Sequence, residues 1–442
     1  MMAVFFILFC VLALGACEDL TRDSIFRISP TSDIELSIVK GLKSKNVVFW
    51  FEPNLHVPTE AVIPTSSKDE VISILERGNI EFSEVEKTLG RAVLKENYLN
   101  KKEKLKSTRQ HTFSRPTLDY ILSYYATYGE IVLWLRKMQR RWWNIATIVN
   151  IGKTREGRDM IVFKLGLKSA KPKPIIFIDA GIHSREWLAP ATALYLIHKL
   201  TEGYWTGKSR YLLEMYDWYI LPVENPDGYE MTFKGGESRM WRKNKRPVNP
   251  DLLEEGDDDC FFHGVDLNRN WDYRWNETNP GQCFDDYGGP AAFSEPETQN
   301  VRDIMLKLLK NGRLKAVVSM HAYSELWMIP WSSELTHPAD RADLMQVSLA
   351  ATNAIFESSG HHWKAGSPPE IIYPASGTKM DWLKANGVKY AFGLELRPSR
   401  NFMGSGFLIS PDHIKPSGEE IFAAVNAMVL EMRKISLSRG NA

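Results

Sequence analysis

The 442-residue chain is poor in cysteine, in net charge and in long apolar runs. It has only four cysteines, and 55 basic residues nearly balance 54 acidic ones, for a formal net charge of +1. This balance gives no reason to expect nucleic acid or a membrane surface as a partner. Beyond the N-terminus no apolar run reaches the length of a membrane span, and no repeat or low-complexity tract is present. What remains is an ordinary globular composition, long enough for two folded units.

The N-terminus carries the one apolar run that needs its own interpretation. Val4 to Ala13 is almost wholly apolar, and Gly15-Ala16-Cys17 offers small residues for a signal peptidase. The run is too short to span a bilayer, although the basic residue that usually precedes such a run is missing. We therefore predict a secretory signal over residues 1–17 and a secreted, extracellular protein, with an uncleaved anchor as the alternative.

The cysteines agree with export. Cys10 and Cys17 would leave with the signal, so Cys260 and Cys283 remain as an even pair. In an oxidising compartment this pair favours one disulfide, which stabilises by about 3 kcal/mol in a loop-entropy estimate; two buried free thiols are the alternative. Asn276 opens an Asn-Glu-Thr glycosylation sequon inside the loop.

Residues 18–98 read as a small α+β unit, followed by a basic stretch over residues 99–114. Apolar alternation and capping signals predict strands over 24–29, 46–51 and 79–82, and helices over 35–42 and 67–77. Lys101 to Arg109 is polar and densely basic, as in a linker or a solvated helix end. Trypsin-like proteases cut exposed basic segments between domains, so we predict an activating cut between these two residues.

From about residue 115 to 436, short apolar segments alternate with amphipathic ones. The apolar segments predict buried strands of a mixed or parallel sheet, over Ile161–Leu165, Pro174–Asp179, Trp218–Val223 and Ala316–Met320. Helices are expected between them, for instance over Thr192–Leu200 and Thr298–Leu309. No accessory domain is expected after residue 436.

Three potential metal ligands follow or end predicted strands. His183 and Glu186 lie three residues apart just after one strand, and His321 comes directly after another. Imidazole nitrogen and carboxylate oxygen are both good zinc ligands, and a catalytic zinc needs three protein ligands with one open position. Each residue alone would be read as an ordinary hydrogen-bonded group, but together the three predict a His₂Glu zinc site.

Charged residues elsewhere strengthen this interpretation. Glu395 lies in an apolar strand, where a carboxylate is costly to bury without a partner or a function; an ion pair with Arg397 is the alternative. Arg239 and Arg242 flank Trp241, and Arg269 lies in a compact polar cluster. Arginine binds carboxylates with two parallel hydrogen bonds, which lysine cannot do.

The chain resembles the zinc metallocarboxypeptidases of the pancreatic carboxypeptidase A/B type. The matching motifs occur in the family's order: His183-Ser-Arg-Glu186, Asn225-Pro-Asp-Gly228, Arg239-Met-Trp-Arg242, Gly264-Val-Asp-Leu-Asn-Arg-Asn-Trp271, Phe293-Ser-Glu-Pro296, His321-Ala-Tyr323, Tyr373-Pro-Ala-Ser-Gly377 and Glu395-Leu-Arg397. Residues 24–98 resemble the family's inhibitory pro-segment. The resemblance implies an α/β catalytic domain over residues 115–436 with a central mixed eight-stranded sheet flanked by helices. A small α+β open-sandwich pro-domain over residues 18–98 would precede it.

The same resemblance implies a role for each site residue. One zinc ion per chain would be held by His183, Glu186 and His321, with Glu395 as the general base and Arg242 as the group that stabilises the oxyanion. The free carboxylate of a peptide substrate would be bound by Asn268, Arg269 and Tyr373, and Arg185 and Arg239 would line further parts of the cleft. Cys260 and Cys283 match the family's disulfide, and the Arg397-Pro398 peptide bond is expected to be cis.

The resemblance also places Met380 at the floor of the pocket for the C-terminal side chain. Because methionine is neutral and flexible, we predict a preference for apolar or aromatic C-terminal residues. Gly393, Ser332 and Thr378 match other walls and add no charge, whereas Lys379 and Pro368 depart from the family pattern. Lys379 is expected to point to solvent; if it pointed inward, acidic C-terminal residues would become possible.

Three other functions remain open at this point. The chain could be a catalytically silent binder of peptide C-termini, a related zinc hydrolase such as a deacylase or a processing carboxypeptidase, or a secreted protein with a structural metal. All the ligand and base positions are filled, which argues against the silent binder.

Overall fold

The computed structural model describes residues 22–440 except 51, 56, 114–117, 250, 252–262, 278–279 and 401–405. The chain divides into two compact units. The first comprises Met1–Tyr98 together with Lys234–Arg239 and Arg400–Leu408, and the second comprises the rest. The predicted signal over residues 1–17 lies outside the described residues.

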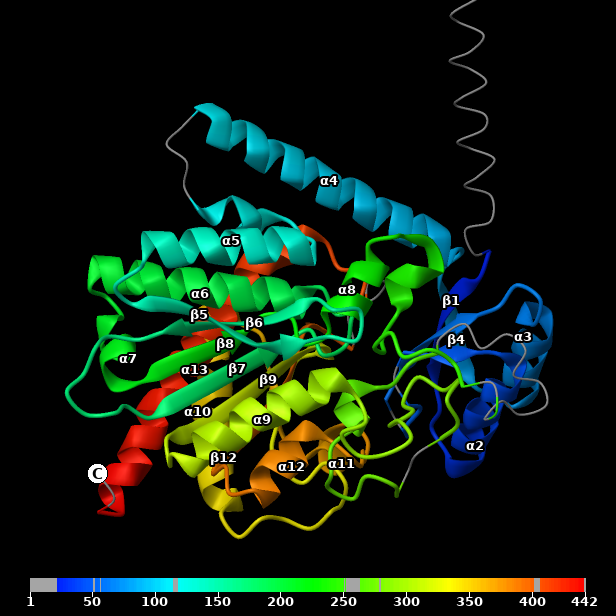
Figure 1. Ribbon diagram of the computed structural model, residues 1–442. Coiled ribbons are helices and arrows are strands. Elements are labelled where there is room, and N and C mark those ends of the chain that lie inside the picture. Colours follow the sequence, from blue (N-terminus) through cyan, green and yellow to red (C-terminus); the bar gives the residue numbers. More distant parts are fainter. Residues whose placement is uncertain are drawn as a thin grey trace, which may run out of the picture. The chain divides into compact units, whose positions relative to one another are not determined.

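The first unit contains a four-stranded sheet in the order β2-β3-β1-β4, with two helices (Figure 1). Its elements are β1 (Ser24–Ser29), α2 (Asp33–Gly41), β2 (Val48–Phe49), β3 (Thr59–Ile63), α3 (Lys68–Arg77) and β4 (Glu81–Glu86). The paired strands are antiparallel, and the core draws apolar side chains from the sheet and from both helices. This is the small α+β unit that the sequence predicted.

The basic stretch that follows is helical. Lys101 to Arg109 lies within α4 (Leu89–Phe113), and most of these side chains are exposed. Of the two interpretations that the sequence allowed, a solvated part of a helix is the one found here. The activating cut within this segment stays a prediction.

The second unit is built on an eight-stranded mixed sheet in the order β11-β10-β12-β9-β7-β8-β6-β5. The strands are β5 (Ala146–Lys153), β6 (Asp159–Leu165), β7 (Ile175–Ala180), β8 (Asp217–Leu221), β9 (Leu314–Ser324), β10 (Leu326–Met328), β11 (Lys364–Gly366) and β12 (Tyr390–Ser399). The four central strands β12, β9, β7 and β8 are parallel, so their carboxyl ends lie at the same edge of the sheet. The predicted fold class is confirmed.

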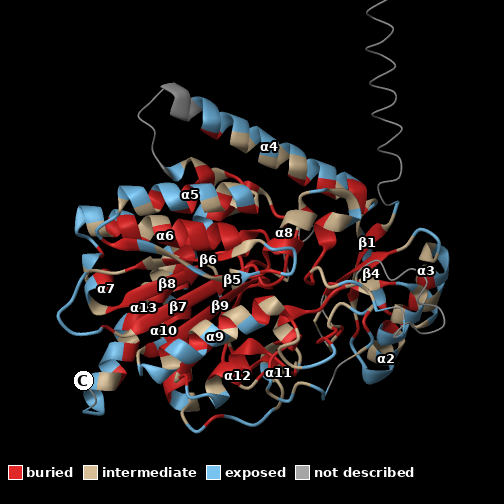
Figure 2. Ribbon diagram, in the orientation of Figure 1, coloured by how far each residue is buried: buried red, intermediate tan, exposed pale blue. Residues whose placement is uncertain are grey.

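Helices flank this sheet, and the strands between them are buried (Figures 1 and 2). The helices are α5 (Tyr128–Arg141), α6 (Leu188–Thr206), α7 (Arg210–Met215), α8 (Pro226–Thr232), α9 (Pro296–Lys310), α10 (Arg341–Ser359), α11 (Pro368–Ile371), α12 (Lys379–Ala385) and α13 (Ile414–Ser438). Local signals set several of their ends: Thr127 and Glu130 form a capping box at the start of α5, and Gly207 ends α6 in the left-handed conformation. Among the described residues, no helix is both long enough and apolar enough to cross a bilayer.

Two further predictions can be compared with the structure. The Arg397-Pro398 peptide bond is cis, as expected. Cys283 is disulfide-bonded, whereas Cys260 lies outside the described residues.

Candidate active site

The three predicted metal ligands come from two neighbouring parallel strands of the central sheet. β7 ends at Ala180, and Gly181 turns the chain with a positive φ of 65° so that His183 and Glu186 follow at once. A side chain at Gly181 would press on Pro190 at 3.0 Å, so glycine suits this turn for space as well as conformation. His321 lies in β9, one residue past the position that pairs with Ala180. The fold therefore brings together side chains that are 135 residues apart in sequence.

The ligand atoms of this cluster lie within 4.8 Å of one another. Nδ1 of His183 is 2.8 Å from Oε1 of Glu186, and Nδ1 of His321 is 3.1 Å from Nδ1 of His183 and 3.3 Å from Oε2 of Glu186. Zinc–nitrogen bonds of about 2.0–2.1 Å would place tetrahedral ligand atoms about 3.3 Å apart. The separations fit zinc, and so does the donor set of two imidazoles and one carboxylate.

Burial sets the charge of this cluster. All three residues are at most 4% exposed, and burial lowers the pKa of His321, so its ring nitrogen stays unprotonated and able to bind a metal. Burial alone would raise the pKa of Glu186, but the two histidines outweigh it and hold this pKa below its usual range. Two imidazole nitrogens and a carboxylate converging in a buried space call for a cation among them.

Asp266 contacts the metal-binding histidine His183 and holds Arg242, a role that the sequence interpretation missed. Its Oδ1 lies 3.1 Å from Nε2 of His183, and its Oδ2 accepts hydrogen bonds from Nε and Nη2 of Arg242 at 3.1 and 2.8 Å. Although burial opposes it, Arg242 and His183 keep the pKa of Asp266 well below its usual range. A metal-binding histidine usually donates a hydrogen bond from its other ring nitrogen, often to a carboxylate. The acidic residue beside Asn268 and Arg269 could have been found by that rule.

Glu395 lies on β12, where its register partner on β9 is His321. It is buried, with 8% of its surface exposed. The alternative partner Arg397 is instead paired with Glu420 of α13, at 3.1 Å from Nε. The structure therefore gives Arg397 another partner and sets Glu395 beside the metal cluster.

Asn268 and Arg269 follow Asp266 closely in sequence and also face its carboxylate. The backbone N–H of Asn268 donates to Oδ1 of Asp266 at 2.8 Å, and Nη1 of Arg269 is 3.9 Å from Oδ2. Gly377 fits against the carbonyl of Arg269 so closely that a Cβ there would lie 2.4 Å from that oxygen. The segment after Tyr373 is thereby held against Arg269, and Tyr373 is close enough to Arg242 to affect its pKa.

The two remaining arginines are paired with other carboxylates. Arg185 donates to Asp285 at 3.0 Å and is 2% exposed. Arg239 belongs to the first compact unit, where its Nη2 donates to Oε1 of Glu96 at 2.9 Å and to the carbonyl of Phe407 at 2.8 Å. Among the predicted site residues that the structure describes, only Arg239 belongs to the first unit; the metal cluster is in the second.

Two methionines border Gly393, and one of them is Met380, the predicted floor of the side-chain pocket. A Cβ added at Gly393 on β12 would lie 3.7 Å from the sulfur of Met380 and 3.4 Å from Cε of Met328. Thr378, which precedes α12, donates to Ser332 at 3.2 Å. The predicted walls therefore adjoin one another, and thioether groups border Gly393.

The expectation that Lys379 points to solvent is wrong. Lys379 is 1% exposed, and its ammonium group is paired with Asp179 at the end of β7 and with Glu224 just after β8. Both carboxylates are fully buried, and they raise the pKa of Lys379 although burial opposes them. The two carboxylates balance the charge of the lysine, without which its burial would be costly.

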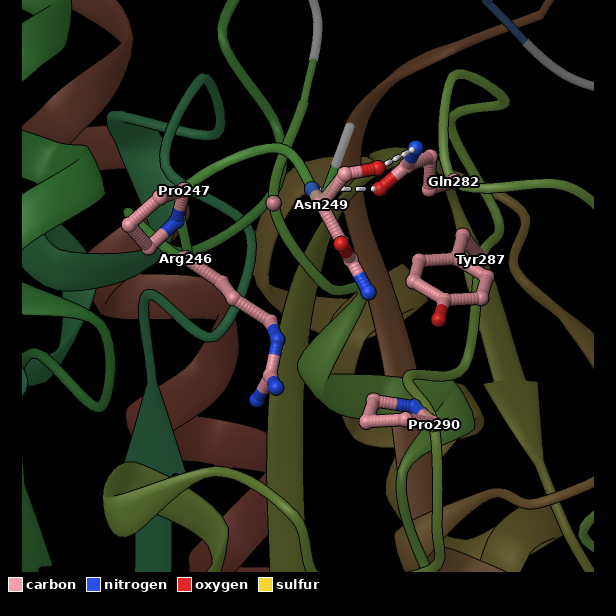
Figure 3. A pocket seen from close by; sticks show the side chains of 7 residues that line it. Arg246, Pro247, Asn249, Gln282, Tyr287 and Pro290 are labelled. Carbon is pink, nitrogen blue, oxygen red and sulfur yellow. Dashed lines mark hydrogen bonds between the residues drawn. The ribbon is translucent and has the colours of Figure 1, made fainter. Parts of the chain in front are cut away.

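A small cavity of about 30 Å³ lies apart from these residues (Figure 3). It is lined by Arg246, Pro247, Asn249, Gly264, Gln282, Tyr287 and Pro290. Gln282 spans one side, accepting from the backbone N–H of Asn249 at 3.0 Å and donating to its carbonyl at 2.8 Å. The cavity has room for about one or two water molecules and borders none of the metal cluster.

Fold and site together define a metal-dependent hydrolase. The features are a His₂Glu cluster at the carboxyl edge of parallel strands, a buried carboxylate beside it and an arginine aligned by Asp266.

Comparison with known proteins identifies the class more closely. The family model described as zinc carboxypeptidase matches residues 131–424. Carboxypeptidase B of Astacus astacus is 38% identical over 307 residues, covering 69% of this chain and 95% of that protein. Zinc carboxypeptidase A 1 of Anopheles gambiae is 30% identical over 433 residues, covering 96% and 93%. The crystal structure of thrombin activatable fibrinolysis inhibitor superposes with a TM-score of 0.79 at 27% identity, covering 92% and 98%.

The chain belongs to the zinc carboxypeptidase family. It is a metallocarboxypeptidase, a peptide hydrolase whose cofactor is zinc. The donor set of His183, Glu186 and His321 suits that ion.

Proposed function

We propose that this carboxypeptidase is secreted as a zymogen and removes apolar or aromatic residues from the C-termini of peptides. The proposed preference rests on Gly393, because thioether groups border it, and on Lys379, whose ammonium group is held by two carboxylates. A lysine whose charge is already balanced offers little to an acidic side chain.

Each site residue has a defined part in this proposal. His183, Glu186 and His321 hold the zinc, which when bound polarises the scissile carbonyl and lowers the pKa of water to about 7. Glu395 takes the proton from the attacking water and passes it to the leaving amine. Arg242, held in place by Asp266, faces the oxyanion as it develops.

Recognition of the chain end follows from charge. Arg269, Asn268 and Tyr373 bind the free carboxylate of the substrate, with Arg269 supplying the cation. The N–H of Lys379 donates to Oδ1 of Asn268 at 3.1 Å, which leaves the amide Nδ2 of Asn268 directed to donate. An internal peptide segment would leave Arg269 unpaired, so cleavage is confined to the terminal bond.

A cleavage profile tests the preference. Blocked dipeptides that differ only in the C-terminal residue should give kcat/KM values highest for Phe and Leu and at least about 10-fold lower for Glu and Lys. A chelator should abolish all of these activities, and added zinc should restore them. Faster release of Glu, or of Lys, would overturn the proposed pocket, and inactivity with zinc bound would favour a silent binder.

The zymogen proposal rests on Glu96 and Arg239. These side chains form a buried pair within the first compact unit. The family resemblance assigns Arg239 to the substrate cleft, so in the uncut chain the carboxylate of Glu96 takes the place of a substrate group on this arginine. The exposed basic part of α4 is suited to a trypsin-like protease, and removing the segment before it would release Arg239.

Limited proteolysis tests this part. Trypsin treatment of the full chain should cut between Lys101 and Arg109 and raise kcat/KM at least about 10-fold, since a buried ion pair must otherwise be broken. A variant with the basic residues of that stretch changed to glutamine should stay inactive under the same treatment. Full activity before any cut would contradict the zymogen proposal.

A further inference from the structure

An exposed group of aromatic side chains lies where α5 ends and α6 ends. Trp143 is 79% exposed and Trp205 is 72% exposed, and both are large apolar groups that proteins rarely leave in water. Trp142 brings the two segments together, with its ring 6.3 Å from that of Trp205 and 6.1 Å from that of Tyr204. We call Trp142, Trp143, Tyr204 and Trp205 the aromatic patch.

Basic side chains surround the aromatic patch. Between Glu130 and Glu156 the sequence has six basic residues and no acidic one. Four of them, Arg136, Lys137, Arg140 and Arg141, are exposed along the last two turns of α5, whose outward face is open to solvent (Figure 2). The net charge of +1 conceals this local concentration, because it averages over the whole chain.

The neighbouring acidic groups do not cancel this charge. Glu202 and Glu214 are the acidic residues near Tyr204 and Trp205 in sequence, and each already faces a basic side chain. Lys199 lies 3.6 Å from Glu202, and Arg210 lies 2.9 Å from Glu214. Asp159, which lies near Arg136, is likewise paired, with Lys153 at 2.6 Å. The basic groups of α5 therefore remain available to an anionic partner.

The ring geometry distinguishes between two anionic partners. A sugar chain stacks on flat aromatic faces, but Trp142 meets Tyr204 at 81° and Trp205 at 61°, which forms no flat platform. The guanidinium of Arg141 lies 5.3 Å from the ring centre of Trp142 and 6.0 Å from that of Trp205. A lipid interface accepts both groups, since indole rings settle at the level of the headgroups and guanidinium groups pair with phosphates.

We propose that the aromatic patch and the basic face of α5 dock this enzyme on an anionic lipid surface. The metal cluster and its pocket take no part in this contact, so the chemistry of the bound enzyme is unchanged. The bound state is a surface association, with indole rings in the headgroup layer and basic side chains over it.

Vesicle binding tests the proposal with the full chain. Phosphatidylcholine vesicles should bind weakly, and adding about 30% phosphatidylserine should raise the partition coefficient at least 10-fold, because each cation near such a surface contributes about fivefold. Tryptophan fluorescence should shift to the blue on binding, and about 0.5 M salt should release the protein.

Two variants separate the contributions. The double variant R136Q/R140Q should lower the partition coefficient about 25-fold, and W143A/W205A should lower it at least about threefold and remove the blue shift. L335A, which changes another exposed apolar residue (68% exposed), is the matched control and should bind as the original chain does. Hydrolysis of a small soluble substrate should stay the same in all of them.

Either of two results would overturn the proposal. One is equal binding to neutral and anionic vesicles, or none to either. The other is tight retention on a sulfated polysaccharide, lost in R136Q/R140Q, without any vesicle binding, which would make the partner a glycan.

Discussion

Arg242 donates two hydrogen bonds to a single carboxylate oxygen of Asp266, from Nε at 3.1 Å and from Nη2 at 2.8 Å. The other oxygen of Asp266 lies 3.1 Å from Nε2 of His183. One buried carboxylate therefore aligns both a metal-binding imidazole and the proposed oxyanion-binding guanidinium. The pKa of Arg242 rises as a result, since Asp266 outweighs the effect of burial.

Changing Asp266 to Asn should damage metal binding and catalysis together. The amide nitrogen would face two donors on either side, Nε and Nη2 of Arg242 or the N–H groups of His183 and Asn268. Two hydrogen bonds are therefore lost whichever way the amide turns. We expect zinc affinity to fall about 10- to 100-fold, with a lower kcat/KM even at saturating zinc. Chelator competition and steady-state kinetics measure the two effects. Asp303→Asn, at an exposed carboxylate, is the control, and unchanged zinc affinity in Asp266→Asn would disprove the role.

Glu395 and Glu420 are two buried carboxylates that should fail in different ways. We expect Glu395→Gln to lower kcat by about 100- to 10,000-fold while zinc content and thermal stability stay the same. Glu420→Gln leaves the buried Arg397 without its charged partner, which should cost about 3–5 kcal/mol of stability. Its folded fraction should keep its kcat. A normal kcat in Glu395→Gln would remove Glu395 from the mechanism.

The sequence predicted elements well where one local signal dominates. β1 is found over the expected residues Ser24–Ser29, and β7 begins one residue late, because alternation or unbroken apolar character marks a buried strand. The strand β3 was missed. Its sequence Thr-Glu-Ala-Val-Ile has no clear alternation, and its place in the sheet depends on pairing with β1, a contact far away in sequence.

The site was predicted as far as motifs reach. His183, Glu186 and His321 lie together as the spacing and strand ends suggested. Lys379 was misplaced, because its burial depends on Asp179 and Glu224, which lie 200 and 155 residues away and give no local signal. Arg239 likewise pairs with Glu96, and no sequence pattern near Arg239 predicts this partner.

Glu224 should make stability depend on pH. Burial raises its pKa to about 7, from an ordinary value of 4.5, despite the nearby Lys379. The folded chain therefore keeps a proton that the unfolded chain has lost, so the contribution of this group to stability falls as pH rises from about 4.5 to 7. Glu224→Gln lacks this dependence.

Thermal unfolding of zinc-saturated protein at pH 5 and pH 8 measures this effect. We expect the difference in melting temperature, Glu224→Gln minus the original chain, to be more positive at pH 8 than at pH 5. Glu214→Gln, at an exposed carboxylate, should show no such change. A difference that is the same at both values of pH would mean that Glu224 does not hold the proton.

Gly393 sets the width of the proposed pocket, and alanine there should change specificity without harming the fold. The added Cβ would lie 3.4 Å from Met328 and 3.7 Å from Met380, which are ordinary contacts, so the melting temperature should change little.

The methyl group added at Gly393 would occupy space that a terminal aromatic ring needs. We expect kcat/KM for C-terminal Phe to fall about 10- to 200-fold, since even one methylene in an apolar pocket carries that much discrimination. The value for C-terminal Ala should stay within about twofold, because a small side chain does not reach the added group. An equal fall for both substrates would indicate that the change acts on Glu395, two residues along the same strand, and that the pocket lies elsewhere.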